Sequence, residues 1–282
     1  MKIYLKFIKA YLNFLSVVAP KYGGKIAVNM FQKVRIKKIK EKELDFYNKS
    51  IHFRVKRVGE EDLHCYEFGS KNKKVVFLIH GWDSNAGSLS RFAEELVKKN
   101  YRVISLDLPA HTNTKARHTN LFECSEAFKT LILHVNPKQP FDIISHSFGS
   151  SVAAYALANS ISYEVNKIVY LSANNNVESI FRHYQKMIGF NDIIYKEVGF
   201  WVKKIIKEDL SEMIIADKLR QASFDELLII HDKYDKVIPH NNAQEIYDAI
   251  KNVQLVTFEK IGHYRMLWNE DVIKETIEFI TK

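Results

Sequence analysis

The sequence has little of what makes a chain flexible, cross-linked or metal-bound. Five prolines and ten glycines in 282 residues leave no room for a long flexible linker. The two cysteines, Cys65 and Cys124, form no disulfide framework and no CxxC pattern. We expect both to be buried thiols of a cytoplasmic protein. With 46% hydrophobic and 27% charged residues, the composition excludes a disordered or collagen-like chain and is typical of a globular protein.

Signatures of cofactors are also missing. No GxGxxG follows a strand-like run and no Walker-type loop is present, so a nucleotide cofactor has no evident cradle. His64, His118, His134 and His183 are scattered without the spacing of metal ligands. These residues therefore give no motif for a nucleotide cofactor and no metal-ligand spacing.

Excess positive charge is confined to one end of the chain. Residues 1–60 hold 15 Lys and Arg against 4 Asp and Glu, whereas the remaining 222 residues hold 27 against 29. A nucleic-acid-binding domain would place its basic residues on a recognisable binding fold, so we expect no nucleic-acid partner. A weak attraction to anionic membrane surfaces remains open.

The first 20 residues lack the uninterrupted apolar run of a transmembrane helix. Their apolar side chains instead recur at intervals of three and four, which predicts an amphipathic helix. These side chains are Tyr4, Phe7, Ile8, Tyr11, Leu12, Phe14, Leu15 and Val18. We expect residues 1–50 to form a basic helical extension, interrupted at 20–24, that docks on the body by this apolar stripe. A helix lying on a membrane surface is the second interpretation, and a cleaved signal the third.

Beyond residue 50, strand-like runs alternate with helical patterns, which predicts an α/β fold with a doubly wound, mostly parallel sheet. Residues 51–176 and 223–282 form the predicted core, and the helical pattern at 177–222 is an insertion. The expected strands are 51–57, 63–68, 75–79, 101–106, 141–144, 168–171, 227–230 and 253–258, and the expected helices are 89–97, 122–135, 148–159, 241–250 and 272–280.

The most informative segment is Ser-His-Ser-Phe-Gly at 145–149, between an apolar strand and an alanine-rich helix. It matches the nucleophile-elbow pattern GxSxG, with Ser145 in place of the first glycine. Only small residues fit two positions before and after the nucleophile, because the turn is tight. The pattern predicts Ser147 as the nucleophile at a helix N-terminus, where negative charge is stabilised.

A His-Gly-Trp segment at 80–82 follows the strand 75–79 directly. Acyl transfer needs two backbone N–H groups aimed at one oxyanion. We expect these from Trp82 and from Phe148, with Gly81 allowing the backbone to approach closely. The alternative is an ordinary turn with a packed tryptophan.

Two later strand ends supply an acid and a base. Asp232 and Asp235 follow the strand 227–230, and His263 follows the strand 253–258. We favour Asp235 as the orienting acid because it lies in the loop that starts the next helix, and we expect Asp232 to stabilise a turn. Ser147, Asp235 and His263 each follow a strand at its C-terminal end, where doubly wound sheets place their sites.

Together these motifs resemble the α/β-hydrolase superfamily, and within it the small serine esterases with a helical cap. The segments that carry the resemblance are HGW at 80–82, DLPAH at 107–111, SHSFG at 145–149, HDKYDKVIP at 231–239 and GHYRML at 262–267. The resemblance implies hydrolysis of a small ester through Ser147, a cap at 177–222 over the pocket, and no cofactor. The apolar character of the cap indicates an apolar acyl group. It leaves open an acyltransferase or peroxidase with the same triad, a ligand-binding protein without turnover, and the oligomeric state.

Overall fold

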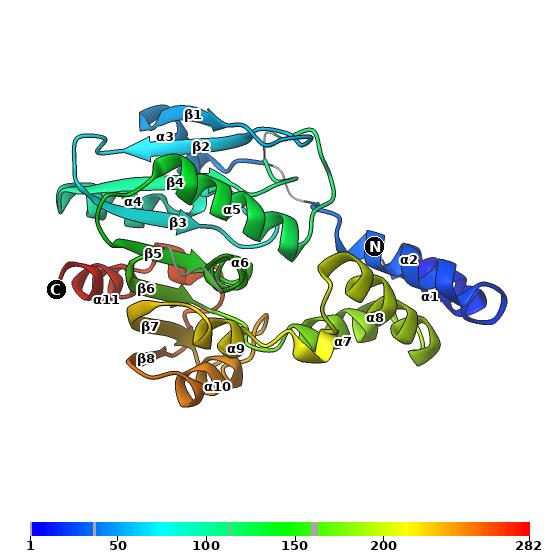
Figure 1. Cartoon of the computed structure of the whole chain (residues 1–282). Coiled ribbons are helices and arrows are strands. Elements are labelled where there is room, and N and C mark those ends of the chain that lie inside the picture. Colours follow the sequence, from blue (N-terminus) through cyan, green and yellow to red (C-terminus); the bar gives the residue numbers. More distant parts are fainter. Residues whose placement is uncertain (1, 36–37, 113, 159–162) are drawn as a thin grey trace. The chain divides into compact units, whose positions relative to one another are not determined.

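The computed structural model of the chain describes residues 2–35, 38–112, 114–158 and 163–282. The chain divides into two compact units, each assembled from two separate stretches of sequence (Figure 1). The smaller unit comprises Met1–Lys33 and Asn176–Ile214, and the larger comprises Val34–Asn175 and Ile215–Lys282.

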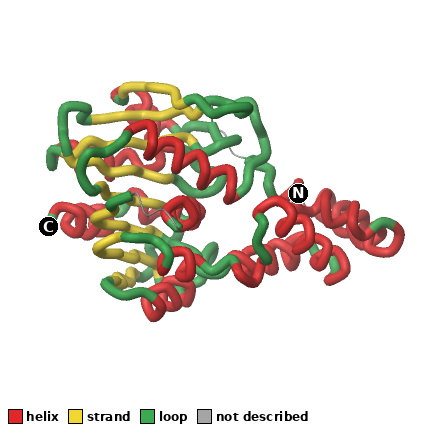
Figure 2. The backbone as a smooth tube through the Cα atoms, viewed as in Figure 1, coloured by secondary structure: helices red, strands yellow, loops and turns green. Residues whose placement is uncertain are grey.

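Among the described residues, the larger unit is built on an eight-stranded sheet with the order β1-β2-β4-β3-β5-β6-β7-β8 (Figures 1 and 2). β2 pairs antiparallel with β1 and β4, and the remaining neighbours are parallel. Each strand overlaps a range expected from the sequence, which confirms the predicted α/β class. The strands are β1 (Ile51–Val55), β2 (Leu63–Phe68), β3 (Lys74–Ile79), β4 (Tyr101–Asp107), β5 (Phe141–His146), β6 (Val165–Leu171), β7 (Phe224–Asp232) and β8 (Val253–Phe258).

Helices cover both faces of this sheet, and the central strands β3, β5, β6 and β7 are therefore mostly buried, with apolar runs such as 75–79 and 227–230. Two groups of mutually contacting helices make the two layers. One group is α3 (Glu41–Lys49), α4 (Ser90–Lys98) and α11 (Glu270–Thr281); the other is α5 (Leu121–Val135), α6 (Phe148–Leu157), α9 (Ile215–Arg220) and α10 (Asn241–Ala249). The expected helix 148–159 reaches Asn159, which lies outside the described residues. Cys65 and Cys124 are buried free thiols, as predicted.

The smaller unit contains the helices α1 (Lys2–Val18), α2 (Pro20–Phe31), α7 (Val177–Ile188) and α8 (Asp192–Ile206). The interruption expected at 20–24 is wrong, since those residues begin α2. Proline is favourable in the first turn of a helix, where its missing N–H is not needed. Gly23 and Gly24 face α8, and a Cβ on Gly24 would lie 2.4 Å from the Cβ of Glu197. These glycines therefore permit close helix packing instead of breaking the helix.

The apolar stripe predicted on α1 is divided between two faces. Leu12 and Leu15 are buried against the other helices of the unit, whereas Phe7 and Phe14 are exposed. Asn13 fixes α1 to the turn between α7 and α8, because its side chain donates to the carbonyl of Gly189 and accepts from the N–H of Asn191. The expectation that the whole stripe is buried is wrong, since apolar side chains occupy more of the helix circumference than one packing face covers.

The segments predicted as the N-terminal extension (1–50) and the insertion (177–222) end later than the two stretches of the smaller unit, Met1–Lys33 and Asn176–Ile214. Residues 34–50 belong to the larger unit, because Phe46 and Tyr47 of α3 enter its hydrophobic core. Residues 215–222 also belong to it, since α9 packs on α6.

The α2–α8 packing gives a test with a matched control in the same unit. We expect Gly24→Ala to lower the free energy of unfolding by ~1–3 kcal/mol, because the added methyl group overlaps the backbone at Glu197. Gly199 lies in α8, and no atom is within 4 Å of a Cβ placed there. Gly199→Ala should therefore stabilise the protein by up to ~1 kcal/mol through helix propensity. Urea unfolding followed by circular dichroism compares the variants, and two equally stable variants would contradict the close packing.

Candidate active site

Ser147 occupies the turn between β5 and α6, with backbone angles φ 52° and ψ −120°. This conformation is costly for any residue other than glycine, and it persists only where neighbouring structure enforces it. Two backbone hydrogen bonds do so: the N–H of Ser147 donates to the carbonyl of Leu171 (2.9 Å), and its carbonyl accepts from the N–H of Ser150 (2.9 Å). The turn presents Ser147 as a half-buried residue at the N-terminus of α6.

Small residues flank the nucleophile position for steric reasons that the structure makes explicit. A Cβ on Gly149 would lie 2.5 Å from the carbonyl oxygen of Ile79 and 2.7 Å from that of His80. Glycine is therefore required where α6 approaches the end of β3. Ser145 has no solvent contact, but its hydroxyl lies 3.1 Å from that of Ser150. A serine is thus accommodated where the family pattern has glycine.

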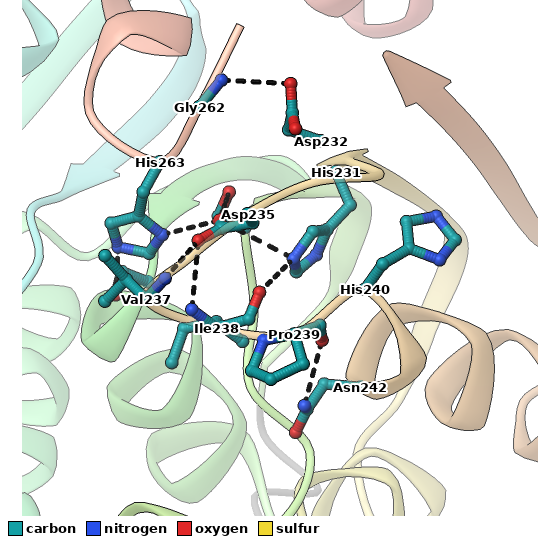
Figure 3. Close-up of polar contacts among 12 residues, drawn as sticks. His231, Asp232, Asp235, Val237, Ile238, Pro239, His240, Asn242, Gly262 and His263 are labelled. Carbon is teal, nitrogen blue, oxygen red and sulfur yellow. Dashed lines mark hydrogen bonds and ion pairs between the residues drawn. The ribbon is translucent and has the colours of Figure 1, made fainter. Parts of the chain in front are cut away.

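His263 lies between Ser147 and Asp235 and contacts both. Its Nδ1 is 2.8 Å from Oδ2 of Asp235 (Figure 3), and its Nε2 is 3.0 Å from Oγ of Ser147. The network assigns the proton to Nδ1, which donates to the carboxylate, so that Nε2 accepts from the Ser147 hydroxyl. The structure brings together the three side chains predicted from separate strand ends.

Asp235 is buried but fully hydrogen-bonded. Its Oδ1 accepts the backbone N–H groups of Val237 (2.7 Å) and Ile238 (3.0 Å), and its Oδ2 accepts the Ser172 hydroxyl (2.9 Å) in addition to His263 (Figure 3). Burial by itself would raise the pKa of Asp235, but the hydrogen bonds from His263 and the two N–H groups lower it to about 2. The carboxylate is therefore ionised at neutral pH.

Asp232 has the structural role expected of it. Its Oδ1 accepts the N–H of Tyr234 (2.7 Å), and its Oδ2 accepts the N–H of Ile261. Its Oδ2 also accepts the N–H of Gly262 at 2.9 Å (Figure 3). These bonds join the end of β7 to the loop that carries His263. Asp232 thus holds the backbone next to the histidine, and Asp235 contacts the imidazole itself.

The His-Gly-Trp turn lies beside the nucleophile. A Cβ on Gly81 would be 3.2 Å from the Cβ of Ser147, so the turn approaches the elbow as closely as a glycine allows. The Trp82 ring packs edge-on against the Phe148 ring, with their centroids 5.1 Å apart. The two residues predicted to supply oxyanion N–H groups are therefore neighbours in space.

Two buried histidines support this turn. Nε2 of His80 accepts the N–H of Leu108 (2.9 Å), while its Nδ1 donates to the carbonyl of Gly81 (2.8 Å). Nε2 of His111 accepts the N–H of Asp83 (3.3 Å). Burial lowers the pKa of His80 to about 4, and burial together with repulsion from His80 lowers the pKa of His111 to about 3. Both rings are neutral at pH 7 and act as fixed donors and acceptors for the backbone.

Two contact residues of the site were not predicted from the sequence. Ser172 donates to Asp235 and directly follows β6, so it shares the strand-end position that marked the other candidates. His146 donates from Nε2 to the carbonyl oxygen of His263 (3.0 Å). Burial and the nearby His263 lower the pKa of His146 to about 3, so it adds no positive charge beside the imidazole. Its place beside Ser147 in the motif is the signal that could have found it.

Within the described part of the chain, no group of three or more His, Cys, Asp or Glu side chains is arranged to hold a metal ion. The site joins a serine hydroxyl, an imidazole and an ionised carboxylate in one hydrogen-bonded chain.

The sequence and the fold were compared with known proteins. The model of the alpha/beta hydrolase fold family matches residues 74–199, which include the His-Gly-Trp turn and the elbow. A search of curated protein sequences finds no match.

Solved structures share this fold at low sequence identity. An Acinetobacter baumannii AYE protein, provisionally described as a lipase, has a TM-score of 0.64 at 21% identity, covering 84% of this chain and 93% of its own. An esterase from Pyrococcus furiosus has a TM-score of 0.64 at 20% identity, covering 87% and 96%. A bromoperoxidase from Bacillus anthracis has a TM-score of 0.61 at 14% identity, covering 82% and 100%. By its sheet, its strand–turn–helix elbow and its structural neighbours, the chain has the alpha/beta hydrolase fold, and the model of that fold family matches its residues 74–199.

Proposed function

We propose that the protein is a serine hydrolase that cleaves carboxylic esters through an acyl-enzyme on Ser147. The observation that carries the proposal is the unbroken hydrogen-bond chain from Ser147 Oγ through His263 to Asp235. A serine hydroxyl is a weak nucleophile unless a base accepts its proton, and a third group must orient that base. The esterase and lipase descriptions of the structural neighbours are consistent with this chemistry.

In the first half-reaction Ser147 Oγ attacks the ester carbonyl while Nε2 of His263 takes the hydroxyl proton. The tetrahedral intermediate collapses when His263 gives that proton to the leaving alcohol, which leaves an acyl-serine. In the second half-reaction water attacks the acyl carbonyl, and His263 again accepts and returns a proton to release the acid. Asp235 stays ionised throughout and stabilises the imidazolium, which its low pKa supports.

The oxyanion of each intermediate is proposed to bind the backbone N–H groups of Trp82 and Phe148. Phe148 is the first residue of α6, where the helix dipole favours negative charge. Gly81 brings the preceding turn against Ser147, which supports a second donor from Trp82. Both groups are fixed before the reaction starts, and this preorganisation is what makes such donors effective.

The substrate is proposed to be a small ester with an apolar acyl group. A cavity beside His263 is lined by nine residues, which include the exposed side chains of Tyr234, Val237 and Tyr264 and also Lys236, Lys260 and Arg265. The two aromatic rings and the valine are the part of this lining that supports an apolar acyl group.

The nucleophile assignment predicts that Ser147→Ala and His263→Ala each lower kcat by ~10⁴–10⁶ without unfolding the protein. Hydrolysis of p-nitrophenyl esters from acetyl to palmitoyl measures the loss and ranks the acyl chains. Ser70, an exposed turn residue, provides the control, since Ser70→Ala should hydrolyse esters like the wild type. A Ser147→Ala protein that retains more than about a tenth of the wild-type rate would refute the assignment.

The two aspartates should differ in their effect on the reaction. Asp235→Asn is expected to lower kcat by up to ~10⁴, because an amide cannot fix the imidazole tautomer or stabilise the imidazolium. Asp232→Asn should cost much less activity, since Asp232 bonds to backbone N–H groups and not to the ring. Steady-state kinetics of both variants tests the choice, and the reverse order of effects would show that it is wrong.

Asp235 should also make stability depend on pH in a defined window. The folded-state pKa of about 2 lies below the ordinary value of 3.8, so the ionised carboxylate stabilises the fold above pH ~4. This contribution, about 2 kcal/mol, is lost as the pH falls toward 2. Urea unfolding should therefore show wild type and Asp235→Asn converging in stability below pH ~4. A gap between them that stays constant down to pH ~2 would contradict the low pKa.

A further inference from the structure

One face of α1 presents large apolar side chains that the smaller unit leaves uncovered. Tyr4, Phe7, Tyr11, Phe14 and Val18 follow each other at intervals of three and four, and each is between 49% and 71% exposed. This spacing aligns them along one side of the helix. Contiguous exposed apolar surface of this kind marks an interaction site more often than a chance arrangement.

The exposed stripe is distinct from the side by which α1 packs. Leu12 and Leu15 make the packing contacts, and Asn13 and Ser16 hydrogen-bond to the turn between α7 and α8. Anchored in this way, α1 does not need its aromatic side chains for its place in the unit. The stripe is therefore a second, preformed apolar face on a fixed helix.

The N-terminal segment that carries this face has charge of one sign. Residues 1–40 hold ten Lys and Arg and no Asp or Glu. Lys6 and Lys9 of α1 are exposed on the same helix as the stripe, and Lys21 and Lys25 follow at the start of α2. An apolar helix face on a segment whose charges are all positive is complementary to a lipid bilayer with an apolar interior and an anionic surface.

A second group of aromatic and basic side chains lies where α2 meets α8. The Lys21 ammonium is 5.8 Å from the centre of the Phe200 ring, and those of Lys25 and Lys204 are 5.5 Å and 5.0 Å from the centre of the Trp201 ring. Tryptophan, tyrosine and lysine are the residues that occupy the boundary between lipid headgroups and acyl chains. The smaller unit thus has aromatic and lysine side chains together at two places, on α1 and where α2 meets α8.

We propose that α1 binds an anionic lipid bilayer, lying in the plane of its surface with the Tyr4–Val18 stripe inserted at the headgroup boundary. Amphipathic helices with lysines beside aromatic residues bind membranes in this manner. No helix of the described chain is both long enough and apolar enough to cross a membrane, so the contact is peripheral. A second copy of the chain fits less well, because a symmetric contact through this face would bring the lysines of two N-terminal segments together. The inference does not depend on the proposed hydrolase activity.

Flotation of the full chain with vesicles tests the proposal. We expect binding to vesicles of phosphatidylcholine mixed with phosphatidylglycerol, and much weaker binding to phosphatidylcholine alone. Phe7→Ser combined with Phe14→Ser should weaken binding to the anionic vesicles about tenfold or more, because two inserted rings are lost. The matched control removes two exposed aromatic rings from the larger unit by Phe122→Ser with Tyr247→Ser, and it should bind like the wild type.

Salt separates insertion from simple charge attraction. At about 1 M salt, where the Debye length is about 3 Å, part of the wild-type binding should survive and the Phe7/Phe14 variant should lose it. Circular dichroism confirms that both paired variants are folded. The proposal is overturned if the chain does not bind anionic vesicles, or if the Phe7/Phe14 variant binds them as tightly as the control. It is also overturned if sedimentation shows a wild-type dimer that the same variant dissociates while vesicle binding is unchanged.

Discussion

The positive φ of Ser147 sets the geometry on which the rest of the site depends. A serine adopts it only because β5, β6 and α6 hold the turn by hydrogen bonds, and because Gly149 lets α6 approach the end of β3. The strain is local, and the ends of β5 and β6 that enforce it are buried. Because of this backbone conformation, the hydroxyl lies at the N-terminus of α6 within hydrogen-bond distance of His263. The ends of two buried strands and a helix thus position the Ser147 hydroxyl.

The acid and the base are held by a second set of backbone contacts. Asp235 uses the N–H groups of its own loop, and Asp232 uses those of the loop that carries His263. Backbone N–H groups thus bind both carboxylates, and those of Val237 and Ile238 act together with His263 to lower the pKa of Asp235. His146 adds a bond to the carbonyl of His263 and remains neutral. The loops that meet at the strand ends are therefore fixed by polar groups, whereas the sheet beneath is fixed by apolar packing.

Much of this arrangement can be predicted from the sequence, because the residues that follow parallel strands meet at the same edge of the sheet. The alternating pattern predicts the parallel sheet, and the residues after three strand ends predict which side chains meet. Ser172 could not be predicted as a site residue in this way, because nothing in the sequence pairs a serine after β6 with Asp235. Only the fold brings the two side chains together. The glycines of α2 suggest a break because helix propensity disfavours them, but tertiary contact with α8 decides otherwise. On α1, periodicity identifies the apolar residues but cannot say which of them the neighbouring helices cover.

Peptide mapping after reaction with a fluorophosphonate tests the central claim most directly, because the probe reacts only with a serine activated by its neighbours. The account predicts one adduct per chain, located on Ser147, and no adduct in the His263→Ala protein, where the proton acceptor is missing. An adduct on another residue, or labelling of Ser147 that is equally fast without His263, would contradict the account.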